Sequence, residues 1–519
     1  MAEPFYITTA IAYPNGPPHI GFAYEAIAAD VIARFHKAMG REVRLVTGTD
    51  EHGLKMVQTA RDAGRDTLAF ANEMSSHFRV MFEKLNIEYD AFCRTTEDRH
   101  KQASAALWQA MAAAGDLYLG RYEGWYSVRD EAFYDEGELG RGEEGQLLSP
   151  HGTPVDWTVE ESWFFRLSRY RDYLIELNES LGFLEPESRR NEVLAFLRGH
   201  ELRDLSVSRT SFDWGVPVPG SPGHVMYVWV DALTTYLTGS GYPDVGGDFA
   251  KWWPASLHLI GKDIVRFHAV YWPAFLKSAG LPPPRRVFGH GFLLHRGEKM
   301  SKSVGNVVDP IALAERYGVD PLRYFLMREV SFGNDGSYSS KAIVTRCNAE
   351  LANSFGNLAQ RVLSMIHKNL GGQISAFDNT EEDTKLQEVV TAACRYELPR
   401  DFAALNFSQG IEAWLRAVFA CNQYIDAQAP WALRKSDPER MTVVLLTLFW
   451  TLRDLTIAIA PVVPSGAAAI LDQLGIPANE RTFQALDDPE WYQRRVAAAL
   501  RVAAPQAAFP RLELETAHA

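Results

Sequence analysis

Apolar and polar positions alternate in two different patterns along the first fifty residues. Residues 5–9, FYITT, form a short apolar run that predicts a buried strand. Residues 22–40 then carry apolar side chains at helical intervals and end at a glycine, which predicts an amphipathic helix. The sequence EVRLVTGTD, residues 42–50, predicts a second strand that ends in a polar loop. Strand, helix and strand in this order predict a βαβ unit and a parallel sheet.

The order of strand, glycine turn and helix returns in SLHLIGKDIVRFHAVYWPAFL, residues 256–276, and we expect this strand to join the same sheet. Between the two units, residues 117–223 are rich in glycine, glutamate and aromatic residues, with turn clusters such as GELGRGEEG. This change in composition predicts a small inserted domain. From about residue 340 onward, long segments of helical period with short breaks predict an α-helical bundle.

Composition places the chain among ordinary globular proteins. It has 519 residues, of which 47% are hydrophobic and 23% charged, enough for several domains of roughly 150 residues each. No apolar run approaches ~20 residues, so no transmembrane helix is predicted. The opening MAEPFYITTA lacks the basic start of a signal peptide. The four cysteines form no CxxC pair, which favours a reducing cytoplasm and disfavours a cysteine-based zinc site.

The charge balance bears on possible partners. With 52 basic and 65 acidic residues, the net charge is −13. Taken alone, this disfavours a nucleic-acid partner, because binding phosphates requires a positive potential. A basic strip on an acidic body remains compatible with such a partner.

The loop PPHIGF, residues 17–22, leads into the first predicted helix. Unpaired backbone N–H groups and the helix dipole make such a position a favourable phosphate site. Gly21 would let the backbone approach a ligand closely, and His19 could donate a hydrogen bond to a phosphate oxygen. From this stretch alone, an ordinary strand-to-helix turn with a surface histidine is the better interpretation.

A second candidate phosphate loop, KMSKS, covers residues 299–303. Two lysines flanking small hydroxyl residues could close over a polyphosphate and then open. The simpler alternative is a solvated surface loop. A chance match to this pentapeptide in 519 residues has a probability of roughly one in six thousand, so the functional interpretation gains weight.

Together, the stretches TAIAYPNGPPHIG, TGTDEHG, YVWVDAL, LIGKDIVRFH, HGFLLHRGEKMSKS and AQAPWAL resemble the class I aminoacyl-tRNA synthetases, and more narrowly the methionyl-tRNA synthetase family. They span residues 9–433, most of the chain. The resemblance implies ATP-dependent attachment of methionine to its tRNA through methionyl-adenylate, with Mg²⁺ on the phosphates. It also implies a cytoplasmic enzyme with no membrane partner. A monomer is expected, since no appended dimerisation domain is recognisable.

With this resemblance, the predicted fold class is α/β: a Rossmann-type parallel-sheet catalytic domain with an inserted connective domain, followed by an α-helical bundle. The predicted domains are the catalytic halves 1–116 and 224–290, the insert 117–223, the KMSKS and stem-contact region 291–340, and the anticodon-binding bundle 341–519.

The resemblance implies two groups of active-site residues. The catalytic and ATP-binding group comprises His19, Gly21, Asp263, Lys299, Ser301 and Lys302. The methionine-binding group comprises Ala10, Ile11, Tyr13, Asp50, Trp229, Ala232, Leu233, Tyr236, Ile264 and His268. In the second group, Asp50 would pair with the substrate ammonium and the aromatic residues would form walls for the polarizable thioether. Taken singly, the aromatics and His268 would be core residues, and Asp50 could cap a helix.

Phe22 departs from the His-Ile-Gly-His signature of this family, in which the last residue is a second histidine. A phenyl ring cannot donate a hydrogen bond to a phosphate. We expect His19, the helix N-terminus and the two lysines to compensate, because one lost donor at a developing charge typically costs about 3 kcal/mol.

Related enzymes often hold zinc in the insert, but this insert contains no cysteine, Ser127 stands where cysteine is frequent, and His151 is the only histidine near it. We therefore predict no structural zinc. In the bundle, the resemblance points to anticodon binding by Asn353, Asn357, Arg361 and Trp431. Trp431 would stack on a base; alternatively, it is a core residue at a helix start.

Three other functions remain open at this point. The first is another class I aminoacyl-tRNA synthetase with an apolar substrate. The second is a nucleotidyltransferase that makes a small metabolite, against which the helical C-terminal bundle counts. The third is a catalytically inactive tRNA-binding paralogue, which Phe22 suggests and the intact KMSKS sequence disfavours.

Overall fold

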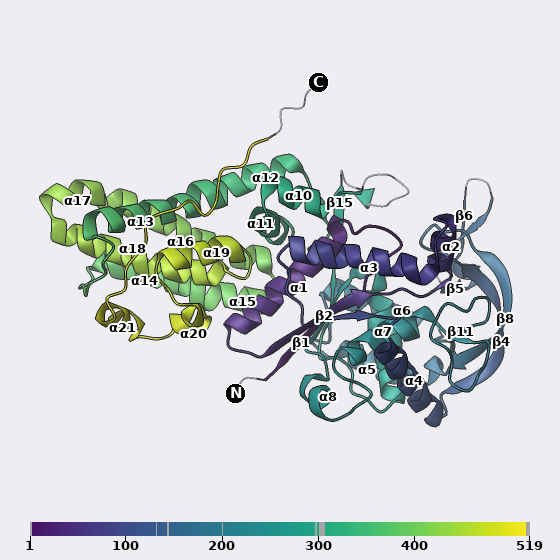
Figure 1. The fold of residues 1–519 in the computed structure, drawn as a ribbon. Coiled ribbons are helices and arrows are strands. Elements are labelled where there is room, and N and C mark those ends of the chain that lie inside the picture. The colour runs from purple at the N-terminus through teal and green to yellow at the C-terminus, as the bar shows by residue number, and fades with distance from the viewer. Residues whose placement is uncertain are drawn as a thin grey trace, which may run out of the picture.

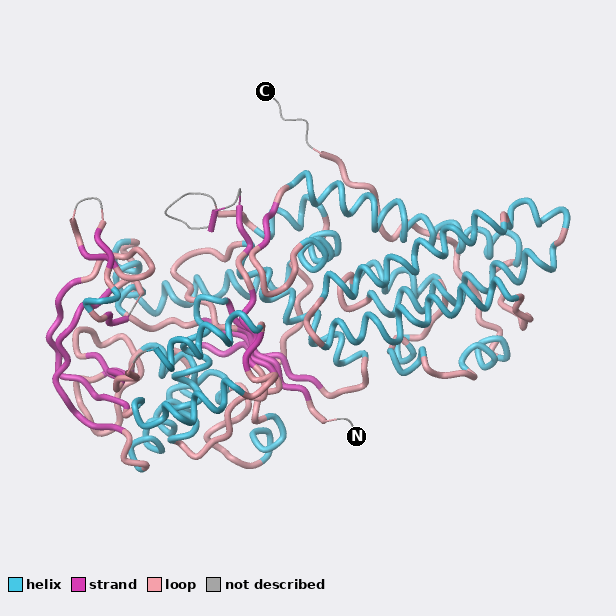
Figure 2. The backbone as a smooth tube through the Cα atoms, turned by 180° about the vertical axis from the view of Figure 1, so that it is seen from behind, coloured by secondary structure: helices cyan, strands magenta, loops and turns pink. Residues whose placement is uncertain are grey.

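A six-stranded parallel sheet lies at the centre of the N-terminal half (Figures 1 and 2). The computed structural model describes residues 3–130, 132–142, 145–199, 201–295, 298–299 and 307–514. The strand order is β3-β2-β1-β13-β14-β9. The strand bounds are β1 Phe5–Thr9, β2 Val43–Thr49, β3 Ala91–Arg94, β9 Leu184–Glu185, β13 Leu257–Gly261 and β14 Val287–His290. The predicted α/β fold class is confirmed, and both predicted strand units belong to this one sheet.

The strand order reverses between β1 and β13. From β1 the chain proceeds outward through β2 and β3, and it later returns to the other side of β1 with β13 and β14. In open parallel sheets, ligands bind in the crevice beyond the carboxyl ends of the strands at such a reversal. The segments that follow β1, β2 and β13 are therefore the ones that the topology brings to a common site.

Helices cover both faces of the sheet, as a parallel sheet requires. One face packs on α1 and α3, and the other on α4, α7 and α9; alternate residues of β1, such as Tyr6 and Ile7, enter the two cores. The helix bounds in this half are α1 Ile20–Ala38, α2 Leu54–Asp62, α3 Thr67–Lys84, α4 Asp98–Ala113, α7 Val228–Thr238, α8 Gly247–Trp252 and α9 Trp272–Ser278.

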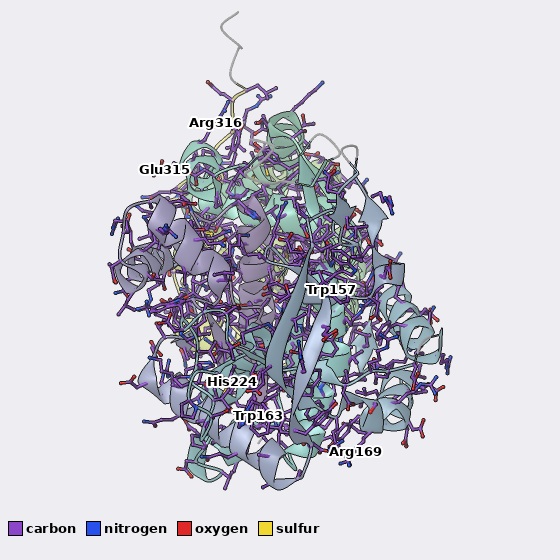
Figure 3. All side chains as sticks on the ribbon, turned by 90° about the vertical axis from the view of Figure 1, so that its right-hand side faces the viewer. Trp157, Trp163, Arg169, His224, Glu315 and Arg316 are labelled. Atoms are coloured by element: carbon purple, nitrogen blue, oxygen red, sulfur yellow. The ribbon has the colours of Figure 1, made fainter. Side chains whose placement is uncertain are left out.

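The insert is built on a long antiparallel pair, β4 Leu117–Ser127 and β8 Asp156–Phe165. Figure 3 views the molecule from this end, with Trp157 and Trp163 on β8. The remaining elements are β5 Ala132–Tyr134, β6 Gly140–Arg141, β7 Leu147–Leu148, α5 Arg171–Glu179, α6 Glu187–Gly199, β10 Leu205–Ser206, β11 Ser208–Arg209 and β12 Val225–Met226. The short strand β9 also lies within residues 117–223, yet it pairs with β14 in the central sheet. The domain boundaries themselves stay predictions.

A small sheet and two helices connect the catalytic half to the bundle. They are β15 Leu293–His295, β16 Glu298–Lys299, α10 Pro310–Tyr317, α11 Val319–Glu329 and β17 Gly336–Tyr338. Arg323 of α11 is fully buried and donates to Asp30 of α1 and to the carbonyls of Leu85, Asn86, Pro461 and Val462. The bundle is thus fixed to α1, the helix that begins at the candidate phosphate loop.

From residue 340 onward, the regular elements among the described residues are helices, which loops connect (Figure 2). Its elements are α12 Ser340–Cys347, the π-helix η5 Asn348–Gly356, α13 Asn357–Leu370, α14 Glu381–Thr391, the π-helix η6 Ala392–Glu397, α15 Leu398–Ala403, α16 Phe407–Gln428, α17 Pro430–Ser436, α18 Pro438–Ile459, α19 Pro464–Gln473, α20 Phe483–Leu486 and α21 Trp491–Ala497. Among the described residues, only α18 is long and apolar enough to cross a membrane, and 83% of its apolar window is buried inside the fold.

Candidate active site

His19 forms the N-cap of α1. Its Nδ1 accepts a hydrogen bond from the backbone N–H of Gly21 at 3.1 Å, so in the neutral ring the proton lies on Nε2. A Cβ atom on residue 21 would lie 2.8 Å from Cε1 of His19. Glycine is therefore required here by the capping ring. Because Nδ1 accepts in the cap, Nε2 is the nitrogen of the His19 ring that can donate a hydrogen bond.

Phe22 packs against His19 rather than pointing into solvent. The two ring centroids are 4.4 Å apart, and Phe22 also makes an edge-to-face contact with Phe78 of α3 at 5.3 Å. Phe22 thus supports the His19 ring from one side. A small cavity of about 20 Å³ lies beside it, at the ends of β1 and β2, with room for about one water molecule.

A partly buried acid–base pair, which sequence reasoning missed, lies behind this turn. Nε2 of His290 is 2.8 Å from Oε2 of Glu25, and Nδ1 of His290 donates to the carbonyl of Gly291. Burial raises the pKa of Glu25, and the nearby charge of Asp263 raises it further. Burial alone would lower the pKa of His290, but the hydrogen bond and charge of Glu25 raise it more. Asp263 therefore lies close to this pair.

The chain that follows the KMSKS stretch contacts the start of α1. The backbone N–H of Ile20 donates to the carbonyl of Val308 at 3.0 Å, and Val308 packs against the same core as Phe22. Val308 follows the KMSKS stretch by five residues. Lys299 pairs through its backbone with Leu294 of β15, whereas Ser301 and Lys302 lie outside the described residues.

The loops after β1 and β2 are tied together beside this turn. The N–H of Ala12 donates to the carbonyl of Gly48, and the N–H of Asp50 donates to the carbonyl of Ala12 at 2.8 Å. The N–H of Ala10 donates to Leu259 of β13. The partly buried residues Ala10 and Ile11 and the carboxylate of Asp50 consequently lie at the strand reversal.

Tyr236 and His268 form the centre of the second group. The hydroxyl of Tyr236 lies 2.7 Å from Nε2 of His268, and Nδ1 of His268 donates to the carbonyl of Ile264. Burial lowers the pKa of His268 to about 4, so the ring is neutral near pH 7 and Nε2 accepts the Tyr236 proton. Burial, with the charges of Glu25 and Asp50, raises the pKa of Tyr236 well above its usual value. Asp50 is therefore close to Tyr236.

Trp229 supplies an aromatic wall next to this pair. Its ring stacks on Phe267 at 3.7 Å and lies edge-on to His268 at 6.2 Å. Ala232 and Leu233 are buried on the same helix, α7. Phe267 was not predicted, because its position depends on the π-helical turn η4 Phe267–Tyr271, which helical periodicity does not indicate.

Tyr13 packs elsewhere than the rest of its predicted group. Its ring contacts a separate apolar cluster, which consists of Met56, Ala60, Phe70, Met74 and Trp214. The ammonium of Lys55 lies 5.7 Å from the ring centroid. The structure therefore brings Asp50, Trp229, Tyr236, Ile264 and His268 together, whereas the Tyr13 ring packs on the separate cluster.

Comparison with known proteins decides which family this site belongs to. Residues 5–142 and 146–363 match the tRNA synthetases class I (M) family, and residues 375–518 match the anticodon binding domain of methionyl tRNA ligase. The chain belongs to the methionyl-tRNA synthetase family. The recognition made from the sequence motifs is confirmed.

Relatives of this methionyl-tRNA synthetase family member match over nearly its whole length. The methionine–tRNA ligase of Brucella suis biovar 1 is 54% identical, over 98% of each chain. That of Mesorhizobium japonicum is 55% identical, over 93% of each chain. The solved Mycobacterium tuberculosis methionyl-tRNA synthetase in complex with methionyl-adenylate has a TM-score of 0.93 and 51% identity, covering 98% of this chain and 100% of that one.

In this synthetase, Trp431 and Arg361 meet on the surface of the bundle. The Arg361 guanidinium lies 5.4 Å from the centroid of the Trp431 ring and forms an ion pair with Asp426 at 2.7 Å. Trp431 is 51% exposed, so the interpretation as a core residue is wrong. Asn353 and Asn357 are also exposed, on η5 and at the start of α13. Their roles stay predictions.

In the part of the insert where related enzymes often hold zinc, hydroxyl groups surround the carboxylate of Asp130. Oδ2 of Asp130 accepts hydrogen bonds from Tyr134, Ser149 and Thr153, and Ser127 lies 2.6 Å from the Thr153 hydroxyl. Hydrogen bonds of this network connect the end of β4 with the segment just before β8. Among the described residues, no group of three or more His, Cys, Asp or Glu side chains could hold a metal ion.

We expect metal analysis of the purified synthetase to find far less than one zinc ion per chain. Neutral hydroxyls are poor zinc ligands compared with thiolates and imidazoles. A chelator should therefore leave the melting temperature unchanged. Stoichiometric zinc that survives dialysis, or a large fall in melting temperature on chelation, would contradict this prediction.

Proposed function

We propose that this chain attaches methionine to its tRNA in two steps. The methionine carboxylate attacks the α-phosphorus of ATP, which gives methionyl-adenylate and releases pyrophosphate. A ribose hydroxyl at the 3′ end of the tRNA, by family resemblance the 2′-hydroxyl, then attacks the activated carbonyl and releases AMP. The observation that carries this proposal is the match to methionine–tRNA ligases along 98% of the chain at 54% identity.

The phosphate side of the site is proposed to be formed by the start of α1 and the KMSKS stretch. Nε2 of His19 and the first N–H groups of α1 would donate to the phosphates, with Gly21 keeping the backbone close. Lys299, Ser301 and Lys302 would contact the phosphates from the other side. The hydrogen bond from Ile20 to Val308 supports this convergence. Asp263, next to the acidic Glu25, suits ribose hydroxyls better than phosphates.

The methionine side is proposed to lie between the loop at Asp50 and helix α7. A carboxylate with low exposure is suited to a substrate ammonium, because each charge compensates for the desolvation of the other. Trp229 and Tyr236 would pack on the thioether, together with Ala232, Leu233, Ile264 and His268 and with Ala10 and Ile11 from the β1 loop. Tyr13 packs on a separate cluster and stays a predicted member of this group.

Mg²⁺ is proposed to enter the site with ATP. Its ligands would be mainly phosphate oxygens, as is usual for nucleotide-bound magnesium. When bound, it would neutralise charge on the phosphates as pyrophosphate leaves. We further propose a cytoplasmic monomer without a membrane partner, and the burial of α18 within the bundle supports the last point.

The test of this function is the charging of tRNA. The purified chain, with ATP, Mg²⁺, labelled methionine and total tRNA, should form methionyl-tRNA whose ester is lost in mild base. One AMP should appear for each methionyl-tRNA formed. If no aminoacyl-tRNA forms while the protein is folded and binds tRNA, the chain is an inactive tRNA-binding paralogue.

Replacing Trp431 with alanine should lower kcat/KM for tRNA charging about 10- to 100-fold. Stacking on one base contributes about 1–3 kcal/mol, and an exposed tryptophan braced by Arg361 is suited to it. Methionine-dependent ATP–pyrophosphate exchange should be unchanged, because it needs no tRNA. Tyr396→Ala, which removes another exposed aromatic of the bundle, is the control and should charge normally. An equal loss of exchange and charging in Trp431→Ala would show that the residue is structural.

A further inference from the structure

The turn after β2 carries three consecutive ionisable residues, Asp50, Glu51 and His52, of which the last two are held by buried hydrogen bonds. Glu51 is fully buried and accepts two hydrogen bonds from Arg94, at 2.7 and 2.9 Å, and one from the Thr96 hydroxyl at 2.6 Å. These bonds hold the turn against the end of β3. They fix one side of Asp50, the proposed ammonium ligand.

His52 anchors the other side of the turn through a buried carboxylate. Its Nδ1 lies 2.6 Å from Oδ2 of Asp231, while Oδ1 of Asp231 lies 2.6 Å from Nε2 of His100. The side chains of all three residues are at most 4% exposed. Burial would raise the pKa of Asp231, but the charges and hydrogen bonds of the two histidines lower it to about 2. The ionised carboxylate of Asp231 can only accept hydrogen bonds, so the rings of His52 and His100 both donate to it.

This cluster joins three elements that are distant in the sequence. His52 lies in the turn after β2, His100 on α4 and Asp231 on α7, and α4 and α7 pack against each other (Figure 1). Asp231 is adjacent in sequence to Ala232 and lies on the helix that carries Trp229 and Tyr236. The bond from His52 to Asp231 is therefore a direct link between the ammonium side and the thioether side of the proposed methionine pocket.

We propose that Asp231 is a positioning residue for methionine recognition, which acts through His52 to hold Asp50 at a fixed place relative to helix α7. This role rests on the proposed function. Asp231 is proposed to contact neither substrate nor ATP; it would hold Asp50 and the side chains of α7 at fixed relative positions. A shift of about 1 Å in such a group can cost a large factor in the reaction of the bound substrate. His100 completes the cluster by holding the second oxygen of Asp231 on α4.

The test compares two replacements of His52 of similar size. Asparagine places a donor where Nδ1 lies in histidine, whereas leucine removes it. In methionine-dependent exchange, we expect His52→Leu to raise the methionine KM about tenfold or more, with an unchanged ATP KM. The methionine KM of His52→Asn should stay within about threefold of the wild-type value. Asp231→Asn, which keeps one acceptor oxygen, should give a methionine KM between those of the wild type and His52→Leu. It replaces the leucine variant as the test if His52→Leu fails to fold.

Two further measurements separate positioning from a general loss of structure. The inhibition constant of 4-(methylthio)butanoate, which has the thioether but no ammonium, should not change in His52→Leu. In an Asp50→Asn background, His52→Leu should add no further increase in the methionine KM. Equal weakening of the amine-free ligand, additive effects with Asp50→Asn, or an asparagine variant as poor as the leucine variant would overturn the proposal. Wild-type exchange activity tests the proposed function separately, because it does not depend on the variants.

Discussion

Replacing His19 with alanine is expected to lower the kcat of methionine-dependent ATP–pyrophosphate exchange about 100- to 1,000-fold. Nδ1 of His19 accepts the hydrogen bond from Gly21, so Nε2 is the group that we propose would donate to the phosphates. Removing a preorganised donor from a developing negative charge typically costs about 3–4 kcal/mol. Phe22 supplies no donor to replace it. The methionine KM should change little, because the residues proposed to bind methionine, Asp50 and the side chains around Tyr236, do not include His19.

His19→Asn is the matched control for the capping role. Asparagine is a favourable N-cap and can accept from Gly21, but it lacks a group at the position of Nε2. We expect its melting temperature to equal that of the wild type and its kcat to be as low as that of His19→Ala. Wild-type kcat in His19→Asn would show that the histidine only caps the helix and that the proposed phosphate contact is wrong.

Replacing Asp50 with asparagine is expected to raise the methionine KM roughly 100-fold, because a buried ammonium would lose its charge partner. The backbone bond from Asp50 to Ala12 and the anchors at Glu51 remain, so the fold should persist. The ATP KM should stay near its wild-type value. Steady-state exchange at varied methionine and at varied ATP measures both constants.

The ligand itself provides the control for Asp50. Inhibition by 4-(methylthio)butanoate should be unaffected or slightly improved in Asp50→Asn, since this acid has no ammonium to pair. If Asp50→Asn leaves the methionine KM unchanged, or weakens the amine-free acid equally, Asp50 is a structural residue at the end of β2.

The sequence was sufficient for the elements whose residues interact locally. The run FYITT coincides with β1, the helical period stopping before Gly40 corresponds to α1, and SLHLIG contains β13 of the same sheet. Periodicity placed the start of α1 at Phe22, two residues late, because the helix begins with the His19 cap rather than with the first regular apolar spacing. Caps depend on side-chain hydrogen bonds that hydrophobic pattern does not record.

Contacts between distant segments account for what the sequence did not reveal. Glu25 and His290 are 265 residues apart and meet only because the end of β14 lies beside α1. His52, His100 and Asp231 likewise meet through the packing of α4 and α7. The strand β9 joins the central sheet from inside the insert, which local composition cannot indicate. Such pairs require the topology as well as the residue types.

Phe22 shows how one departure from a signature can be accommodated. A histidine at this position would face the same apolar surroundings, including Phe78. The phenyl ring instead packs on His19 and restricts the ring that carries the proposed donor. The compensation by His19, the helix N-terminus and the two lysines stays a prediction, and the structure adds this packing contact to it.

The segments after β1, β2 and β13 are proposed to form one pocket that activates methionine with ATP. Methionine-dependent exchange tests this pocket when each of the standard amino acids is supplied in turn to the wild-type chain and the labelled pyrophosphate incorporated into ATP is measured. We expect rapid exchange with methionine and far slower exchange with every other amino acid. Exchange driven best by a different amino acid, or no exchange with any of them, would contradict it.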